Sequence, residues 1–207
     1  MKREEGSEIP EWIGIGPAPA PYNYGMGIQH QDFIQADLAP AERVLVVRQN
    51  PETNQRESVW LRWGLVPSWA KSPDIGNPLI HARAETVATK PAFREAFRYR
   101  RCLMVADSFA LSARRKRLAI QMKDHRPFGV GGVWERWQRD DQEPTESCAI
   151  ITVPANDLVR PANDRMPLII AQQDYDKWLD ISVQEPELLA GLLVPYPAEE
   201  MLVVPAL

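Results

Sequence analysis

The sequence predicts a single mixed α+β domain in which strands outnumber helices. Short apolar runs rich in β-branched residues recur throughout the 207 residues, and they do not alternate regularly with helical patterns. This order favours an α+β fold over a doubly wound parallel sheet. Because the sequence shows no internal repeat and no long linker, we expect one domain over residues 22–207. An irregular proline-rich segment over residues 1–21 precedes it.

The expected strands are brief apolar runs bounded by turn-forming or charged residues. RVLVVR at residues 43–48 and the aromatic-rich VWLRWGL at residues 59–65 are the first two. Nineteen prolines are scattered between such runs, so they separate many short elements. The other expected strands cover residues 79–86, 102–106, 117–122, 129–134, 149–153, 168–170 and 201–204.

Helical patterns are fewer and shorter than the strand patterns. In KPAFREAFR at residues 90–98, a proline occupies the first turn and two phenylalanines are four positions apart, so they share one helix face. QDYDKWL at residues 173–179 places Tyr175 and Trp178 three positions apart. A third short helix is expected over residues 184–193.

Composition excludes several classes of protein. Hydrophobic residues make up 44% and charged residues 25%, which is typical of a soluble globular protein. No apolar run approaches the ~20 residues of a membrane span. The charged first residues lack the apolar stretch of a signal peptide, so we expect a cytoplasmic protein. Cys102 and Cys148 lie in apolar strand-like runs, which predicts buried, reduced thiols.

Charge is unevenly distributed along the chain. The net charge is −4, which excludes a globally basic nucleic-acid-binding protein. Residues 81–117 nevertheless contain ten Lys or Arg and three acidic residues, a local charge of +7. Such a segment fits either a face that contacts a phosphate backbone or an ordinary solvated face beside acidic neighbours.

Common catalytic signatures are missing from the sequence. It has no glycine-rich phosphate loop, no HExxH and no CxxC, and its three histidines, His30, His81 and His125, lack metal-ligand spacing. We therefore expect neither a metal nor another cofactor.

Seven motifs occur in order: WGLVPSW at residues 63–69, HARAET at 81–86, RCLMVADSF at 101–109, GVWE at 132–135, IITVPAN at 150–156, NDRMP at 163–167 and PYP at 195–197. Together they resemble the SOS-response-associated peptidase (SRAP) family, whose members sense abasic sites in single-stranded DNA. The resemblance extends over nearly the whole chain, from Tyr22 to Val204. It implies a bifurcated, half-barrel-like sheet flanked by short helices, a DNA groove, and a site where an N-terminal cysteine traps the abasic aldehyde covalently.

The chain departs from the family at each of the four positions that the covalent mechanism uses. Lys2 stands where the family has the nucleophilic cysteine, and Leu111 stands where it has a proton-transferring glutamate. His81 replaces the family's asparagine, and Asn163 replaces its histidine. A stable thiazolidine ring needs an amine and a thiol on adjacent carbons, and leucine cannot transfer a proton. The resemblance therefore implies an impaired homologue that recognises DNA without the stable cross-link.

Two explanations of the missing cysteine remain open. The chain is a degenerate paralogue, or its start codon is placed too late and hides an upstream Met-Cys. The replacements at His81, Leu111 and Asn163 count against the second explanation, because a wrong start cannot alter internal positions.

Other positions match the family's DNA-contacting residues. The resemblance implies that Arg83 contacts phosphate or sugar and that Trp69 lies beside a base. Asn23 matches a turn that lines the groove, and Glu85 and Arg165 belong to the same two motifs as His81 and Asn163. Structural roles remain open for these residues. Arg83 can instead form a salt bridge to Glu85 or Asp164, and Asp164 and Arg165 can pair with each other to fix a loop. The other arginines of the basic segment are expected at solvated edges or on DNA phosphates: Arg98, Arg100, Arg101 and residues 114–117.

His81 and Asn163 exchange the residue types that the family has at these positions. If both face one cavity, the site keeps one imidazole and one amide, and these two residues are the candidate catalytic groups; independent drift is the alternative. The sequence thus predicts recognition of single-stranded or abasic DNA in the DNA damage (SOS) response, in a phage or stress setting. One alternative is residual peptidase or abasic-site lyase chemistry by another amine, such as Lys71 or Lys90, aided by His81. The other is a DNA-independent interaction module.

Overall fold

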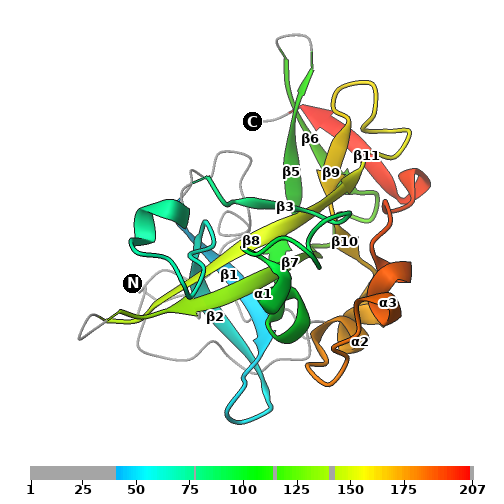
Figure 1. The fold of residues 1–207 in the computed structure, drawn as a ribbon. Helices are drawn as coiled ribbons and strands as arrows, with labels where there is room; N and C mark the ends of the chain where they lie inside the picture. Colours follow the sequence, from blue (N-terminus) through cyan, green and yellow to red (C-terminus); the bar gives the residue numbers. More distant parts are fainter. Residues whose placement is uncertain (1–40, 77, 114–115, 140–142, 206–207) are drawn as a thin grey trace, which may run out of the picture.

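The computed structural model describes residues 41–76, 78–113, 116–139 and 143–205. The expected irregular segment over residues 1–21 and the candidate groove residue Asn23 lie outside these ranges. Eight strands form the larger of two sheets, and the helices are few and short (Figure 1). The expected mixed α+β fold is therefore confirmed.

The larger sheet has the order β10-β7-β4-β1-β2-β8-β3, and β9 pairs with β8. β7 also pairs with β8, so the strands β7, β4, β1, β2 and β8 form a closed ring of pairings. The strand bounds are β1 Arg43–Gln49, β2 Arg56–Trp63, β3 His81–Arg83, β4 Arg101–Ala106, β7 Phe128–Trp137, β8 Thr145–Pro154, β9 Arg165–Pro167 and β10 Ile169–Ile170.

Strand β8 changes its neighbours along its length. Its first part pairs in parallel with β2 and antiparallel with β7. Its second part pairs in parallel with β3 and antiparallel with β9. Thr152 consequently lies opposite Arg83 on one side and Pro167 on the other. This change of partners brings the segments around residues 81–83 and 163–167 to the same end of the sheet.

The second sheet contains three antiparallel strands in the order β11-β6-β5. β5 covers Ser108–Ala113, β6 covers Lys116–Met122 and β11 covers Met201–Pro205. β5 follows β4 after the single residue Asp107, so the chain passes directly from one sheet into the other. β5 was not expected from the sequence, because its serines and alanines give no β-branched apolar pattern.

The helices are shorter than the sequence patterns suggested. α1 covers Arg94–Tyr99, α2 covers Tyr175–Leu179 and α3 covers Pro186–Leu189. Short 3₁₀ turns extend this set: η2 Pro73–Gly76, η3 Gln172–Asp174, η4 Ala190–Leu192 and η5 Ala198–Glu200. No helix in the described ranges is long and apolar enough to cross a membrane.

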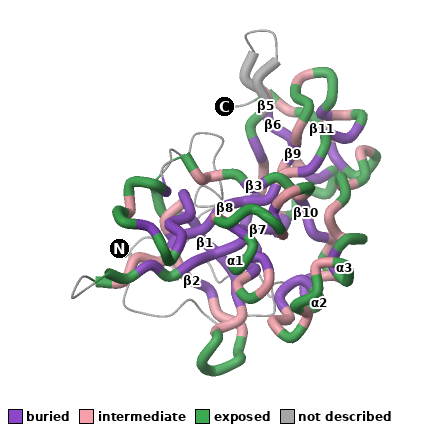
Figure 2. Tube along the Cα trace, viewed as in Figure 1, coloured by how far each residue is buried: buried purple, intermediate pink, exposed green. Residues whose placement is uncertain are grey.

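The core lies along the central strands, where the buried residues of β1, β4, β7 and β8 follow one another (Figure 2). Phe97 of α1 and Trp178 of α2 pack edge-on against each other in this core, with ring centroids 6.1 Å apart. Cys102 and Cys148 are fully buried, which confirms that they are structural thiols, and desolvation raises the pKa of both. At Gly132 an added Cβ would lie 2.8 Å from the Ala149 carbonyl oxygen, so the close β7–β8 approach requires glycine there.

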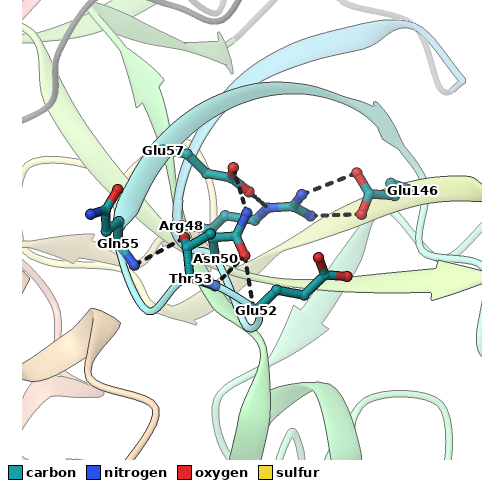
Figure 3. Close-up of polar contacts among 7 residues, drawn as sticks. All are labelled: Arg48, Asn50, Glu52, Thr53, Gln55, Glu57 and Glu146. Carbon is teal, nitrogen blue, oxygen red and sulfur yellow. Dashed lines mark hydrogen bonds and ion pairs between the residues drawn. The ribbon is translucent and has the colours of Figure 1, made fainter.

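A buried arginine of β1, Arg48, links this strand to β2 and β8 (Figure 3). Arg48 Nε donates to Glu57 at 2.7 Å, and its Nη1 and Nη2 donate to the two carboxylate oxygens of Glu146 at 3.0 and 3.2 Å. The guanidinium carbon also lies 3.9 Å from the ring centroid of Trp134. Two carboxylates and an aromatic face thus compensate the loss of hydration of this cation.

Arg101 is a structural residue, contrary to the expected solvated edge or phosphate contact. Its side chain is buried and donates to four backbone carbonyls. Two of them, Phe97 and Arg98, belong to α1, and the other two are Trp178 and Asp180. Helix ends leave carbonyls without partners, and Arg101 supplies donors to α1 and to the end of α2. Arg100 is engaged as well, since it pairs with the buried Glu135 at 2.7 Å.

Candidate functional site

A pocket of about 570 Å³ lies where the two sheets meet, between β3, β5 and β9 of Figure 1. Met104, Val130, Ile150 and Met166 give it an apolar wall. Its polar side chains come from segments that are far apart in the sequence: His81, Arg83, Lys90, Ser108, Thr152, Asn163 and Arg165. The described lining contains three cationic side chains and no carboxylate, so the pocket is suited to an anionic or neutral polar ligand.

His81 and Arg83 reach the pocket because they alternate on β3. Both are exposed, while Ala82 between them is buried, as the two-residue period of a strand requires. The expected strand over residues 79–86 was too long: β3 ends at Arg83, and Thr86 donates its backbone N–H to the Arg83 carbonyl in a turn. Glu85 is therefore a turn residue, and the strand does not direct its side chain.

The His81 ring packs edge-on against Trp63, with ring centroids 5.9 Å apart and an interplanar angle of 69°. Trp63 is held by its indole N–H, which donates to the Ile80 carbonyl at 3.1 Å. Although part of His81 remains accessible, its partial burial lowers the pKa of the imidazole below 6.5. The ring is therefore neutral at pH 7 and can accept a proton.

Arg165 forms the ion pair with Glu85 that had been expected for Arg83. Its Nη1 and Nη2 donate to the two oxygens of Glu85 at 2.5 and 3.0 Å, and Nη2 also donates to Thr152. The hydrogen bond from Arg165 lowers the pKa of the Glu85 carboxyl group. In the described ranges neither the expected bond from Arg83 to Glu85 or Asp164 nor the expected pair of Asp164 with Arg165 is present.

Arg83 and Lys90 are the two pocket cations without an ion-pair or hydrogen-bond partner among the described side chains. Lys90 is exposed and precedes α1, where its carbonyl accepts the backbone N–H of Phe93 and of Arg94, both at 2.9 Å. Its backbone is thus fixed while its ammonium group stays available. These two side chains supply free positive charge at the pocket.

Asn163 lines the same pocket as His81, as the exchange of residue types predicted. It is exposed, and its Oδ1 accepts the backbone N–H of Arg165 at 3.4 Å. The backbone N–H of Asn163 donates to the Val159 carbonyl, which fixes the turn before β9. The catalytic roles of His81 and Asn163 stay predictions.

Trp69 is 59% exposed, which is unusual for the largest apolar side chain. Its indole N–H donates to the carbonyl of Pro91 at 3.4 Å, the residue that follows Lys90. Trp69 is not among the residues that line the pocket, and this bond ties its ring to the residue after the lining Lys90. Most of the ring remains available for stacking.

Thr152 and Met166 line the pocket but were not predicted as site residues. Each lies in a recognised motif, Thr152 in IITVPAN and Met166 in NDRMP, so the motifs could have revealed them. No group of three or more His, Cys, Asp or Glu side chains in the described ranges could bind a metal ion.

Comparisons with known proteins agree with this architecture. The chain is 36% identical over 170 residues to the abasic site processing protein YoqW of Bacillus subtilis (strain 168), covering 80% of this chain and 75% of that protein. It is 27% identical over 167 residues to the abasic site processing protein YedK of Escherichia coli (strain K12), covering 77% of this chain and 72% of that one.

Solved structures share the fold. A protein from Bacteroides thetaiotaomicron superposes with a TM-score of 0.71 at 30% identity, covering 79% of this chain and 73% of that chain. A protein from Bordetella bronchiseptica gives the same TM-score at 24% identity, covering 83% and 87%, which is a likeness of fold. A family model described as SOS response associated peptidase (SRAP) matches residues 25–206. With most of its length matched by that model, this chain belongs to the SRAP family.

Proposed function

We propose that this protein recognises abasic sites in single-stranded DNA, in the context of DNA damage, and that it does so without a stable covalent linkage. The observation that carries the proposal is Arg83, which lines the pocket without a hydrogen bond or ion pair among the described residues. The exposed Trp69, bonded to the carbonyl of Pro91, supports it. The relatives named abasic site processing proteins support abasic DNA as the ligand.

Electrostatics supports a nucleic-acid ligand even though the whole chain is acidic. Arg83 and Lys90 form no hydrogen bond or ion pair with a described residue, although the charge of Arg83 contributes to the lowered pKa of Glu85. None of the described lining residues carries a carboxylate. A DNA phosphate next to these cations would release condensed counterions, which drives binding at low salt. The overall charge of −4 would in turn oppose unspecific adhesion to DNA outside this site.

The exposed indole of Trp69 supports a preference for single strands. Bases in a duplex are stacked on one another, whereas an unpaired base offers a free face to an aromatic ring. A nucleotide that lacks its base leaves the adjacent base with one stacking neighbour fewer. We therefore place a base next to the lesion on Trp69 and the sugar–phosphate of the lesion beside Arg83.

The non-covalent mode is supported by the chemistry of the described residues. Cys102 and Cys148 are fully buried and the pKa of each thiol is raised, so neither is a nucleophile in the folded protein. Leu111 in β5 has no proton to transfer where the family resemblance implies a glutamate.

The test measures binding by fluorescence anisotropy with three labelled oligonucleotides: single-stranded with one abasic site, single-stranded and intact, and duplex. We expect affinity to decrease in that order and to fall as salt rises. A denaturing gel of the same mixtures without reductant should show no retained DNA. A complete lack of binding at low salt would contradict the proposal and favour a DNA-independent interaction module, and a retained band would contradict the non-covalent mode.

A further inference from the structure

We propose that Lys90 is a reactive amine of this pocket, which forms a transient imine with the aldehyde of an abasic site and cleaves the strand with His81 as the base. The proposal rests on the proposed function, since it takes the same abasic DNA as substrate. It adds an activity, that of an abasic-site lyase, and a nucleophile that the family's terminal cysteine does not provide.

The structure separates the two lysines that the sequence analysis left open. Lys90 lines the pocket together with His81, whereas Lys71 is not part of its lining. The backbone carbonyl of Lys71 accepts a hydrogen bond from Arg139 at 2.8 Å, and its exposed side chain offers a matched control. An amine that attacks a bound aldehyde has to share the cavity with it, so Lys90 is the residue selected.

Lys90 is held in place by its backbone while its ammonium group is free. Its N–H donates to the Thr86 carbonyl at 2.9 Å, and its own carbonyl accepts two N–H groups from the start of α1. No described carboxylate pairs with its Nζ.

His81 is placed to act on the same substrate. It lines the same pocket as Lys90, and the edge-on contact with Trp63 fixes the plane of its ring. With the pKa lowered by burial, the imidazole is neutral at pH 7 and has a lone pair that accepts a proton.

The reaction balances with water alone. The neutral Lys90 amine adds to C1′ of the ring-opened sugar, and the aldehyde oxygen leaves as water, giving an imine. His81 takes a proton from C2′, and the C3′–O bond breaks as the 3′ phosphate leaves with the electron pair. Water then hydrolyses the imine, which restores Lys90 and releases the unsaturated aldehyde on the cut strand.

The experiment incubates the full chain with single-stranded abasic DNA in the presence of sodium borohydride and resolves adducts on a denaturing gel. We expect a trapped adduct that the Lys71→Arg variant forms equally and the Lys90→Arg variant forms at least tenfold less. Anisotropy should show that the Lys71→Arg variant binds the DNA as the wild type does, and that the Lys90→Arg variant, which keeps the charge, is still saturated with DNA at the gel concentrations, so that a lost adduct reports lost chemistry. Peptide mapping of the wild-type adduct should locate the sugar on Lys90.

The role of His81 is tested separately with His81→Asn, which should still give the trapped adduct but cleave the strand at least tenfold more slowly without borohydride. An adduct mapped to another amine, or one that survives Lys90→Arg undiminished, would overturn the inference. Abasic DNA that binds without any trapped adduct would overturn the inference and leave the proposed function intact. Absence of binding in the anisotropy arm would overturn the proposed function itself.

Discussion

The guanidinium of Arg165 donates two hydrogen bonds, of 2.5 and 3.0 Å, to the carboxylate of Glu85, which lies 80 residues earlier in the sequence. The same guanidinium donates to Thr152 of β8, so it ties the turn after β3 to β8 and β9. Because Arg165 forms the hydrogen bonds to Glu85, Arg83 acts on that carboxylate only through its charge, and its guanidinium N–H groups remain available to a ligand. We therefore expect Arg165 and Glu85 to shape the pocket and Arg83 to contact the DNA.

Replacing Arg83 by glutamine should weaken binding to single-stranded abasic DNA and make it less dependent on salt. Loss of one phosphate contact reduces the slope of log K against log salt by about 1, because one counterion fewer is released. Anisotropy titrations at several salt concentrations give this slope. The control is Arg136→Gln, an exposed arginine of β7 outside the pocket, which removes the same charge. Equal losses in both variants would mean that only the net charge matters.

Replacing Trp69 by alanine should weaken single-strand binding by roughly 1–3 kcal/mol, the range of base–aromatic stacking. Because Trp69 is 59% exposed, the free energy of unfolding should change little. Trp69→Phe keeps an aromatic face and should retain most of the affinity. Anisotropy and urea unfolding of the two variants separate stacking from stability, and a Trp69→Ala variant with full affinity would remove Trp69 from the site.

Replacing Arg101 by methionine should destabilise the fold by roughly 3 kcal/mol or more, because a hydrogen bond to a charged group contributes about 1.5–3 kcal/mol. Arg101 donates to four carbonyls, and burial lowers its pKa to about 10, which leaves it charged at pH 7. Arg94→Met on the exposed side of α1 is the matched control and should cost under about 0.5 kcal/mol. Urea unfolding measures both; similar losses would show that Arg101 is not the cap of these helix ends.

The sequence predicted β1 and the second half of β8, because their apolar runs are largely buried and leave few other structures open to them. It missed β5, which has no β-branched residue and becomes a strand through pairing with β6. The strand expected over residues 79–86 was also longer than β3, because the Arg83 carbonyl accepts a turn hydrogen bond from the N–H of Thr86, which no local sequence pattern predicts.

The residue types of the candidate site could be predicted from the sequence, but the ion pairs and hydrogen bonds between them could not. His81, Arg83 and Asn163 were singled out by their residue types, and the pocket brings them together. Which arginine would be free depended on β8 exchanging its neighbours between its two halves, a long-range pairing that one sequence does not specify. Arg165, and not Arg83, forms the ion pair with Glu85, and Arg101 is buried in the core instead of lying on the expected basic face.

The pKa of His81 should lie below 6.5, and the stability of the protein should depend on pH accordingly. Burial disfavours the charged imidazolium, so the unfolded chain binds a proton more readily than the folded one. The contribution of His81 is therefore complete above pH 6.5 and is lost progressively as the pH falls from 6.5 through the lower pKa of the folded state. His81→Asn removes this titration, so the variant should lose less stability than the wild type between pH 7 and pH 5. Urea unfolding across that range gives the difference, in which carboxylate effects common to both proteins cancel, and an NMR titration of the His81 ring gives its midpoint directly. A midpoint at or above 6.5, or identical stability profiles, would show that burial does not lower the pKa of His81 and would remove the support for His81 as the neutral base of this pocket.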